Sequence, residues 1–211
     1  EAVVHCAGQP SHDFSKLNIR QDAEANYMTT VDLAEWLRDH RVPTVFLSTN
    51  KVYGDVVNRS VAYGVEGQRY VPFLGGPKWL DRFFGVNEWC PIDHTQKTPF
   101  GVSKTAADQL MQETYSCFGV PTCVLRCGCI TGESKSAVEL HGFLGYLVQC
   151  ARDRKLYTIY GYGGYQVRDN LAVSDIARAI EMWLRAPIAG VFNMGGGPDN
   201  SISVNEAIRY L

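Results

Sequence analysis

Polar side chains follow an apolar segment of this chain, in a place where chemistry could be carried out. The segment T-V-F-L-S-T, residues 44–49, ends in Ser48 and Thr49 and continues directly into Asn50 and Lys51. Two hydroxyls, an amide and an ammonium at the end of a buried strand are costly to bury unless they bond to something. A polar turn satisfied by its own backbone is the alternative. We favour a binding or catalytic role for these residues.

Small residues end an earlier apolar segment, residues 1–8. Ala7 and Gly8 precede Gln9 there, and their size lets a ligand approach the backbone closely. A tight turn between a strand and a loop explains the same residues equally well.

Phe100 and Lys104 are four residues apart, which is about one turn of a predicted helix. Both therefore lie on the same helix face. Taken alone, a phenylalanine is typical of a core and a lysine of a solvated face.

These segments alternate with helical patterns. Apolar residues recur at helical spacing over 18–39 and 100–118, and buried strands are predicted at 1–8, 44–49 and 121–127. Strands that are apolar on both faces and alternate with helices indicate a Rossmann-like, doubly wound parallel α/β sheet. Because ligands bind beyond the carboxyl ends of such strands, the polar segments are expected at one edge of the sheet.

The second half of the chain is less regular. We predict a helix, a strand, a helix, a strand and a helix, at 138–153, 156–160, 174–185, 190–194 and 203–211. Ser203 and Glu206 have the spacing of a capping box at the start of the last helix. The stretch 55–98 is rich in glycine, proline and aromatics. A loop of that length is uncommon unless it is functional, so we expect it to cover substrate.

Composition limits the possible functions. The chain has 211 residues, a net charge of −2 and no lysine or arginine block, which argues against nucleic-acid binding. No apolar run approaches the roughly 20 residues of a membrane helix. The seven cysteines are an odd number, and most are expected to be small buried residues in a reducing cytoplasm. Cys127 and Cys129 have no second pair, so we expect no metal site.

Five motifs occur in a fixed order along the chain: S-T-N-K-V-Y-G-D, F-G-V-S-K, V-L-R-C-G-C-I-T-G, Q-V-R-D-N and V-F-N-M-G-G-G. In this order they resemble the extended short-chain dehydrogenases/reductases, and most of all the NAD-dependent epimerases of nucleotide-linked sugars of the 2-epimerase type. The resemblance covers essentially the whole chain.

The resemblance implies NAD as cofactor, a nucleotide sugar as substrate and a homodimer formed through the helix that carries Lys104 and the helix before it. It implies an epimerisation in which a hydride leaves a sugar carbon, giving a transient ketone, and then returns to the other face. Thr49 would bond the reacting hydroxyl. Lys104 would hold the hydroxyls of the nicotinamide ribose.

The other expected site residues fall into two sets. Cofactor contacts are expected from Ala7, Gly8, Gln9, Asn26, Ser48, Lys104 and Cys127. Substrate contacts are expected from Asn50, Cys129, His141 and Arg168. By resemblance, Arg168 pairs with a diphosphate, which suits the bidentate bonding of arginine. An ion pair with Asp169 or Asp175 is the alternative for Arg168, and a structural role is the alternative for His141.

Phe100 departs from the family pattern, which has a tyrosine at that position. A phenyl ring cannot exchange a proton with a substrate. Three explanations stay open: the protein binds a nucleotide sugar without catalysis; Thr49, a water or a residue of the 55–98 stretch takes the proton; or Phe100 is a substitution in an active parent. A nucleotide-sugar reductase is a further alternative. Asn50 and Lys51 stand where related dehydratases carry an acidic pair, which disfavours dehydration.

Residues 1–211 contain no glycine-rich phosphate loop of the kind that such enzymes have after their first strand. The only run of three glycines in the sequence, Gly195-Gly196-Gly197, follows a late strand instead. We expect residue 1 to lie at the fourth strand of the usual fold. Residues 1–137 would then be the later part of the NAD-binding domain, and 138–211 a partial substrate-binding region. We expect these residues alone not to bind NAD tightly.

Overall fold

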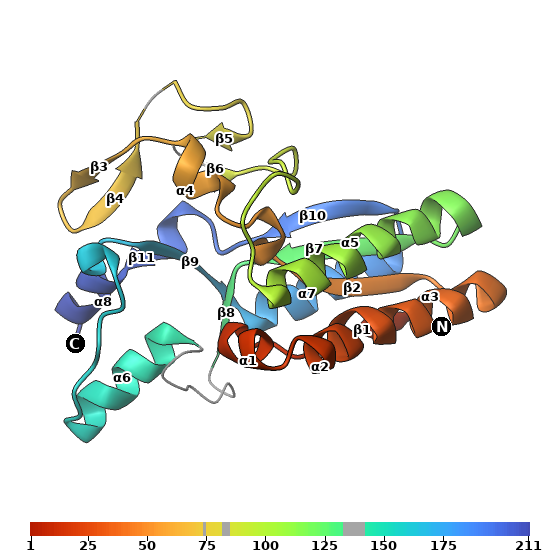
Figure 1. Ribbon diagram of the computed structural model, residues 1–211, viewed down its shortest axis with the longest axis horizontal. Helices are drawn as coiled ribbons and strands as arrows, with labels where there is room; N and C mark the ends of the chain where they lie inside the picture. Colours follow the sequence, from red (N-terminus) through yellow and green to blue (C-terminus); the bar gives the residue numbers. More distant parts are fainter. Residues whose placement is uncertain (74, 82–84, 133–141) are drawn as a thin grey trace. The chain divides into compact units, whose positions relative to one another are not determined.

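A computed structural model describes residues 1–73, 75–81, 85–132 and 142–211 (Figure 1). The chain forms two compact units, each built from three segments. The first unit takes Glu1–Val57, Glu88–Cys127 and Ala177–Met194, and the second takes Asn58–Asn87, Gly128–Ile176 and Gly195–Leu211.

A parallel sheet of four strands lies at the centre of the first unit. In spatial order the strands are β1 (Val3–His5), β2 (Thr44–Thr49), β7 (Thr122–Cys127) and β10 (Gly190–Met194). Thr49 lies opposite Cys127, and Met194 lies opposite Cys127 on its other side. The carboxyl ends of these strands therefore meet at one edge, as the sequence predicted for a doubly wound α/β fold.

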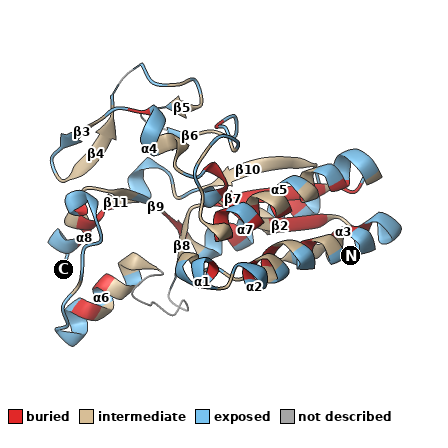
Figure 2. Ribbon diagram, in the orientation of Figure 1, coloured by how far each residue is buried: buried red, intermediate tan, exposed pale blue. Residues whose placement is uncertain are grey.

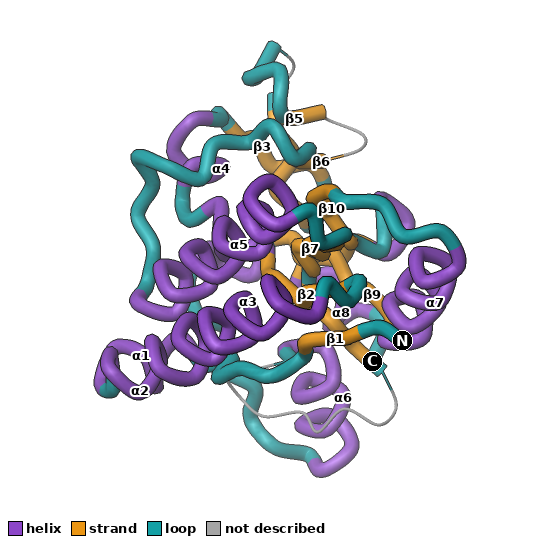
Figure 3. Tube along the Cα trace, turned by 90° about the vertical axis from the view of Figure 1, so that its right-hand side faces the viewer, coloured by secondary structure: helices purple, strands orange, loops and turns teal. Residues whose placement is uncertain are grey.

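Helices lie on both sides of this sheet. Figure 3 shows α3 (Thr29–His40) and α5 (Pro99–Phe118) on one side and α7 (Val173–Arg185) on the other. Every residue of β7 is buried, which explains why its apolar residues do not alternate with solvent-facing polar residues. The core includes fully buried side chains from α3, β2, α5, β7 and the turn between α5 and β7, and Figure 2 shows buried residues along these helices and strands. They are Leu37, Phe46, Ala107, Met111, Val120 and Val124.

Local chemistry sets the ends of α5. The Thr98 hydroxyl accepts a hydrogen bond from the Gly101 amide, Pro99 occupies the first turn, and Gly119 ends the helix with a φ of 68°. No described helix has both the length and the apolar character needed to cross a membrane.

The predicted helix at 18–39 is a longer and less uniform run. It consists of α2 (Ile19–Ala23), a π-helical turn (Glu24–Met28) and α3. An additional short helix, α1 (His12–Leu17), precedes it, with Ser11 as its N-cap.

The second unit contains a sheet of three strands in the order β11 (Ser201–Ser203), β9 (Val167–Ala172) and β8 (Cys129–Thr131). Its other elements are the hairpin of β3 (Tyr63–Glu66) and β4 (Arg69–Pro72), the hairpin of β5 (Leu80–Asp81) and β6 (Gly85–Val86), α6 (Phe143–Asp153) and α8 (Val204–Arg209). The short helix α4 (Val56–Ser60) follows the 3-10 helix Asn50–Tyr53, and two further 3-10 helices cover Tyr162–Gly164 and Pro198–Asn200.

Two predictions for these segments are wrong. Residues 156–160 form no strand: Leu156 is 95% exposed, and the segment pairs with no strand in the part of the chain that the structure describes. The stretch 55–98 is not one long loop, because α4 and the two hairpins lie within it; its expected role in covering substrate stays a prediction. The predicted strand at 190–194 is confirmed as β10. The capping box is confirmed too: the Ser203 hydroxyl accepts from the Glu206 amide at 3.0 Å, and a Glu206 carboxylate oxygen accepts from the Ser203 amide at 2.8 Å.

The triple glycine packs closely against β9. The Gly196 amide donates to the Asp169 carboxylate at 2.6 Å, and a Cβ on Gly196 would lie 1.8 Å from the Asn170 carbonyl oxygen. This close approach explains the glycines at 195 and 196 by packing.

Gly196→Ala is expected to lower the free energy of unfolding by about 1–3 kcal/mol, because a backbone atom blocks the added methyl. Urea unfolding followed by circular dichroism measures the change. Gly76→Ala is the matched control, since among the described residues its Cβ would meet the Leu80 side chain at 3.8 Å, an ordinary contact distance. Equal stability of the two variants would contradict the packing explanation.

Candidate functional site

The end of β2 presents one hydroxyl outward and one inward. Thr49 is partly exposed, and its hydroxyl oxygen accepts from the Lys51 amide at 3.3 Å as it starts the following 3-10 helix. Ser48 is buried and donates to an Asp108 carboxylate oxygen at 2.5 Å. The polar-turn alternative is therefore partly correct, while Thr49 still offers its hydroxyl at the edge of the sheet.

Lys104 is buried beneath this strand end and does not lie on a solvated helix face. It is 7% exposed, its Nζ donates to the Leu47 carbonyl at 2.9 Å, and Nζ lies 4.4 Å from the centre of the Phe46 ring. Burial lowers the pKa of Lys104 to about 8, although the negative charge of Asp108 acts in the opposite direction. The ammonium is thus held at the edge where a ligand of a parallel sheet binds.

Phe100 lies one turn before Lys104 and is also buried. The ring of His12 meets the Phe100 ring edge-on, with the ring centres 4.9 Å apart. His12 Nδ1 lies 2.7 Å from the hydroxyl oxygen of Thr98, the N-cap residue of α5. We did not predict a role for His12 from the sequence. Its signal was its place directly after the polar end of the first strand.

A buried polar cluster joins Gln9 to α5 through Asn26. The Asn26 oxygen accepts from the Gln9 amide at 2.8 Å, and its Nδ2 donates to the Gln9 carbonyl, to Asp22 and to Ser103. The Asp22 carboxylate also accepts from the Ser103 hydroxyl at 2.6 Å and from Gln9 Nε2 at 2.5 Å. A Cβ on Gly8 would lie 2.8 Å from the Asn26 oxygen, so this cluster requires a glycine there. It fixes the backbone at the end of the first strand beside α5.

Asn26→Ala is expected to lower the free energy of unfolding by about 1–3 kcal/mol, since it leaves buried polar groups of Gln9 and Asp22 without their partner. Urea unfolding measures the loss. The exposed Asn50→Ala serves as control and is expected to stay within about 0.5 kcal/mol of the parent protein. Similar stability of both variants would show that the cluster does not fix this segment.

A second buried network holds the strand ends together. Arg126 makes two bonds to the Asp108 carboxylate, at 2.8 and 3.0 Å, and a third to the Tyr53 hydroxyl at 3.1 Å. Tyr53 in turn donates to the Asn193 side-chain oxygen at 2.6 Å. Burial opposes the charge of Arg126, but the bonds and charge of Asp108 outweigh it and raise the pKa of the guanidinium. The network joins β7, α5, the 3-10 helix and β10.

The remaining predicted residues lie in separate places. Cys127 is buried at the end of β7, and burial raises the pKa of its thiol to about 11, so it is a neutral packing residue at neutral pH. Cys129 lies on β8 and Arg168 is exposed on β9, both in the second unit. The Arg168 guanidinium donates to the Val167 carbonyl at 3.1 Å. His141 lies outside the described residues.

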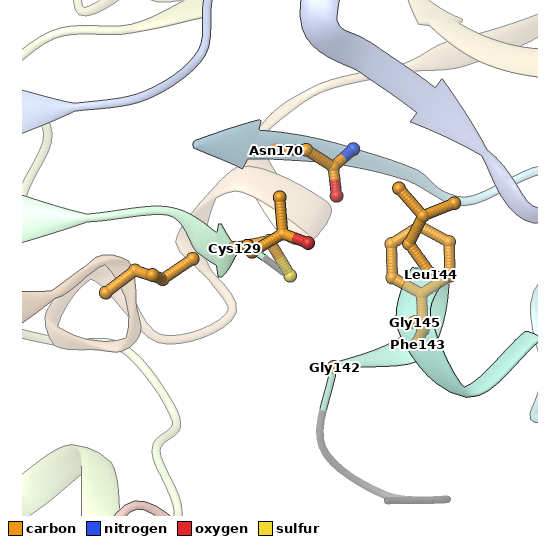
Figure 4. A pocket seen from close by; sticks show the side chains of 9 residues that line it. Cys129, Gly142, Phe143, Leu144, Gly145 and Asn170 are labelled. Atoms are coloured by element: carbon orange, nitrogen blue, oxygen red, sulfur yellow. The ribbon is translucent and has the colours of Figure 1, made fainter. Parts of the chain in front are cut away.

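Two pockets lie among the described residues, one in each unit. In the second unit, a cavity of about 30 Å³ has Cys129, Phe143, Leu144 and Asn170 in its lining (Figure 4). In the first unit, a hollow of about 520 Å³ includes Arg126 in its lining. Neither lining includes the Thr49 or Lys104 side chain, so the strand-end geometry defines the candidate site.

Comparisons with known proteins agree with this geometry. A profile described as the NAD dependent epimerase/dehydratase family matches residues 1–73 and 81–195. A CDP-paratose 2-epimerase from Salmonella typhi is 32% identical over the whole chain, which covers 62% of that relative. A dTDP-glucose 4,6-dehydratase from Neisseria meningitidis is 27% identical, with 93% of this chain and 50% of that relative covered.

Solved structures share the fold. A UDP-glucose 4-epimerase from Thermotoga maritima, with UDP-glucose, matches with a TM-score of 0.72 at 22% identity, over 99% of this chain and 59% of that one. A dTDP-glucose 4,6-dehydratase from Bacillus anthracis, in complex with NAD, matches with a TM-score of 0.68 at 24% identity, over 99% of this chain and 55% of that one. The chain thus spans about half to three fifths of the length of these relatives.

Proposed function

The chain belongs to the NAD dependent epimerase/dehydratase family, and from this premise we propose that the protein epimerises a nucleotide-linked sugar at C2 through a transient ketone. The observation that carries this proposal is the strand-end geometry of β2. The Thr49 hydroxyl reaches the sheet edge, and the Lys104 ammonium is bonded to the Leu47 carbonyl of the same strand. The 32% identity to a CDP-paratose 2-epimerase supports the choice of C2.

The residues after Thr49 favour epimerisation over dehydration. Elimination of water needs a carboxylic acid and a carboxylate close to the reacting carbons. The chain has Asn50 and Lys51 there, and both are exposed. An amide and an ammonium suit recognition of sugar hydroxyls and provide no such acid–base pair.

The residues of the first unit fit a nicotinamide and its ribose. Small residues at Ala7 and Gly8 leave the backbone accessible, and Lys104 provides an ammonium for ribose hydroxyls. An oxidised nicotinamide supplies a reversible hydride acceptor when bound. Thr49 would bond the reacting hydroxyl and orient it. Gln9, Asn26, Ser48 and Cys127 would shape the cofactor side.

Asn50, Cys129, His141 and Arg168 keep their proposed roles toward the substrate. For Arg168, the proposal is supported by its exposed guanidinium on β9, which suits a diphosphate. A homodimer through α3 and α5 and a cytoplasmic location are also part of the proposal. The exposed apolar side chains of Trp36 on α3 and of Val102 and Tyr115 on α5 support the dimer.

A single assay separates this function from its alternatives. The full-length protein that contains this chain is incubated with CDP-paratose and a catalytic amount of NAD in deuterated water. We expect inversion at C2, seen by proton NMR, without deuterium at C2 and without net NADH. In a parallel incubation with NADH in place of NAD, net consumption of NADH would indicate a reductase, and loss of water would indicate a dehydratase. Binding of CDP-paratose without any of these changes would indicate a non-catalytic homologue.

A further inference from the structure

The proposed reaction requires a proton acceptor that Phe100 cannot provide. When a sugar alcohol becomes a ketone, the hydroxyl proton must leave together with the hydride on the same carbon. The inference below therefore rests on the proposed function.

Several ionisable groups near the strand ends are already committed elsewhere. The Lys104 ammonium is buried against Phe46 and bonded to the Leu47 carbonyl. The Tyr53 hydroxyl lies between Arg126 and Asn193. The Cys127 thiol has a pKa raised by burial to about 11.

His5 is also unsuited to this role. Its ring stacks on Phe46 with the ring centres 5.5 Å apart, and its Nε2 lies 3.4 Å from the hydroxyl of the buried Thr30. Burial, and then the positive charge of Lys104, lower the pKa of His5.

His12 is placed differently. It is only partly buried and opens α1, shortly after the carboxyl end of β1. Its ring lies edge-on to Phe100, the residue one turn before Lys104. Its Nδ1 lies 2.7 Å from the Thr98 hydroxyl oxygen, so the N-cap residue of α5 orients the ring. A base that is itself oriented by a third group is the recurring arrangement for proton transfer in enzymes.

We propose that His12 exchanges the proton of the reacting sugar hydroxyl, in place of the phenol that Phe100 lacks. The proton passes from the sugar oxygen to Nε2 of His12 as the C–O bond becomes C=O. The hydride on that carbon passes to an oxidised nicotinamide dinucleotide, so the sugar loses two electrons and the cofactor gains two. Return of the hydride and of the proton to the turned ketone restores both.

His12 has further interactions in the structure, and the proposed role does not require that it has none. Catalytic hydrogen bonds commonly form or tighten only when the substrate is bound. The requirement is that Nε2 meets the hydroxyl in the complex, while Thr98 holds the ring through Nδ1.

The primary test is His12→Gln in the full-length protein, with CDP-paratose as substrate. We expect kcat to fall by about 10²-fold, as is typical when a general base is removed, with KM changed by less than about threefold. In the parent protein, we expect kcat/KM to fall toward acidic pH, because the base must be neutral. That acidic limb should disappear in the variant. His40→Gln is the matched control, since His40 is exposed, its Nδ1 bonds the Trp36 carbonyl of its own helix, and its ring stacks on the Trp36 ring.

A second variant separates proton transfer from a structural effect. Phe100→Tyr added to His12→Gln places a phenol four residues before Lys104. We expect kcat of the double variant to be at least about tenfold higher than that of His12→Gln alone. The acidic limb of its pH profile should lie at higher pH than in the parent protein, since a phenol titrates above an imidazole.

A measurement without catalysis completes the test. Proton NMR of the parent protein without added NAD follows the imidazole signal that His12→Gln removes. We expect CDP-paratose to shift the titration midpoint of that signal and to leave the His40 signal unchanged.

The outcomes distinguish the two proposals. If the parent protein does not invert C2, the proposed function fails and the role of His12 fails with it. If the parent protein inverts C2 but His12→Gln keeps its rate within threefold and its acidic limb, only the role of His12 is wrong. If Phe100→Tyr restores nothing in a folded double variant, or the His12 midpoint is unmoved, His12 has a structural role and the inference is overturned.

Discussion

Replacing Asp108 by alanine is expected to lower the free energy of unfolding by about 3–5 kcal/mol. Asp108 is fully buried and pairs with Arg126, whose side chain is only 4% exposed. Without the carboxylate, the guanidinium stays buried with no compensating charge. Ser48 and Gln112 lose their bonds to the same carboxylate as well. Urea unfolding of the variant, read by circular dichroism, gives the change.

Two controls test whether burial is the cause. Glu181→Ala removes an exposed ion pair on α7, in which the Glu181 side chain is 64% exposed and the Arg185 side chain is 75% exposed. It should change the free energy of unfolding by less than about 1 kcal/mol. The double variant Asp108→Leu with Arg126→Met removes both charges, so it should recover most of the loss. If Asp108→Ala is no worse than Glu181→Ala, the pair is not a buried support of the strand ends.

The buried pair also bears on the candidate site. The Asp108 carboxylate holds Ser48, the residue before Thr49, and Arg126 holds Tyr53 in the 3-10 helix that Thr49 begins. A loss of the pair therefore affects the backbone on both sides of the Thr49 hydroxyl.

The sequence predicted the elements that have strong local signals. Residues 44–49 and 121–127 are mostly apolar and show no regular alternation because both faces of β2 and β7 are covered, so their pattern predicts buried strands. The start and end of α5 follow from Thr98, Pro99 and Gly119. The position of the polar residues that end these strands could also be predicted, since parallel strands bring their carboxyl ends to one edge of the sheet.

Interactions between distant residues could not be predicted in this way. Asp108 lies 18 residues from Arg126 and 60 from Ser48, and a single sequence carries no signal that pairs them. The contact of His12 with Phe100 and Thr98 is of the same kind, since it joins residues more than 80 positions apart. The π-helical turn at Glu24–Met28 also leaves no clear trace, because its residues are ordinary helix formers.

Lys104→Met is expected to reduce turnover by at least about 10²-fold while making the folded protein more stable at neutral pH. Methionine has nearly the length of lysine but no charge, so the ammonium proposed to hold the ribose is lost. Burial lowers the pKa of Lys104 to about 8 from an ordinary value of 10.5. The folded state therefore holds this proton less tightly than the unfolded chain does, and the charged lysine costs stability at pH 7.

The pH dependence gives the sign of this effect. Between about pH 8 and 10.5 the unfolded chain binds a proton at Lys104 that the folded protein does not, so the stability of the parent protein should rise with pH there. Lys104→Met should lack this rise and, after loss of the bond to the Leu47 carbonyl, should be about 1–2 kcal/mol more stable at pH 7. Urea unfolding of nucleotide-free protein at several pH values measures the slope of stability with pH and the gain of the variant at pH 7.

The exposed Lys155→Met is the control and should keep the pH slope of the parent protein. A variant that is inactive, less stable and still follows the parental pH slope would show that Lys104 is a structural residue. The expected combination is a more stable protein with little turnover. It would show that the buried Lys104 ammonium destabilises the fold and is nevertheless required for the reaction.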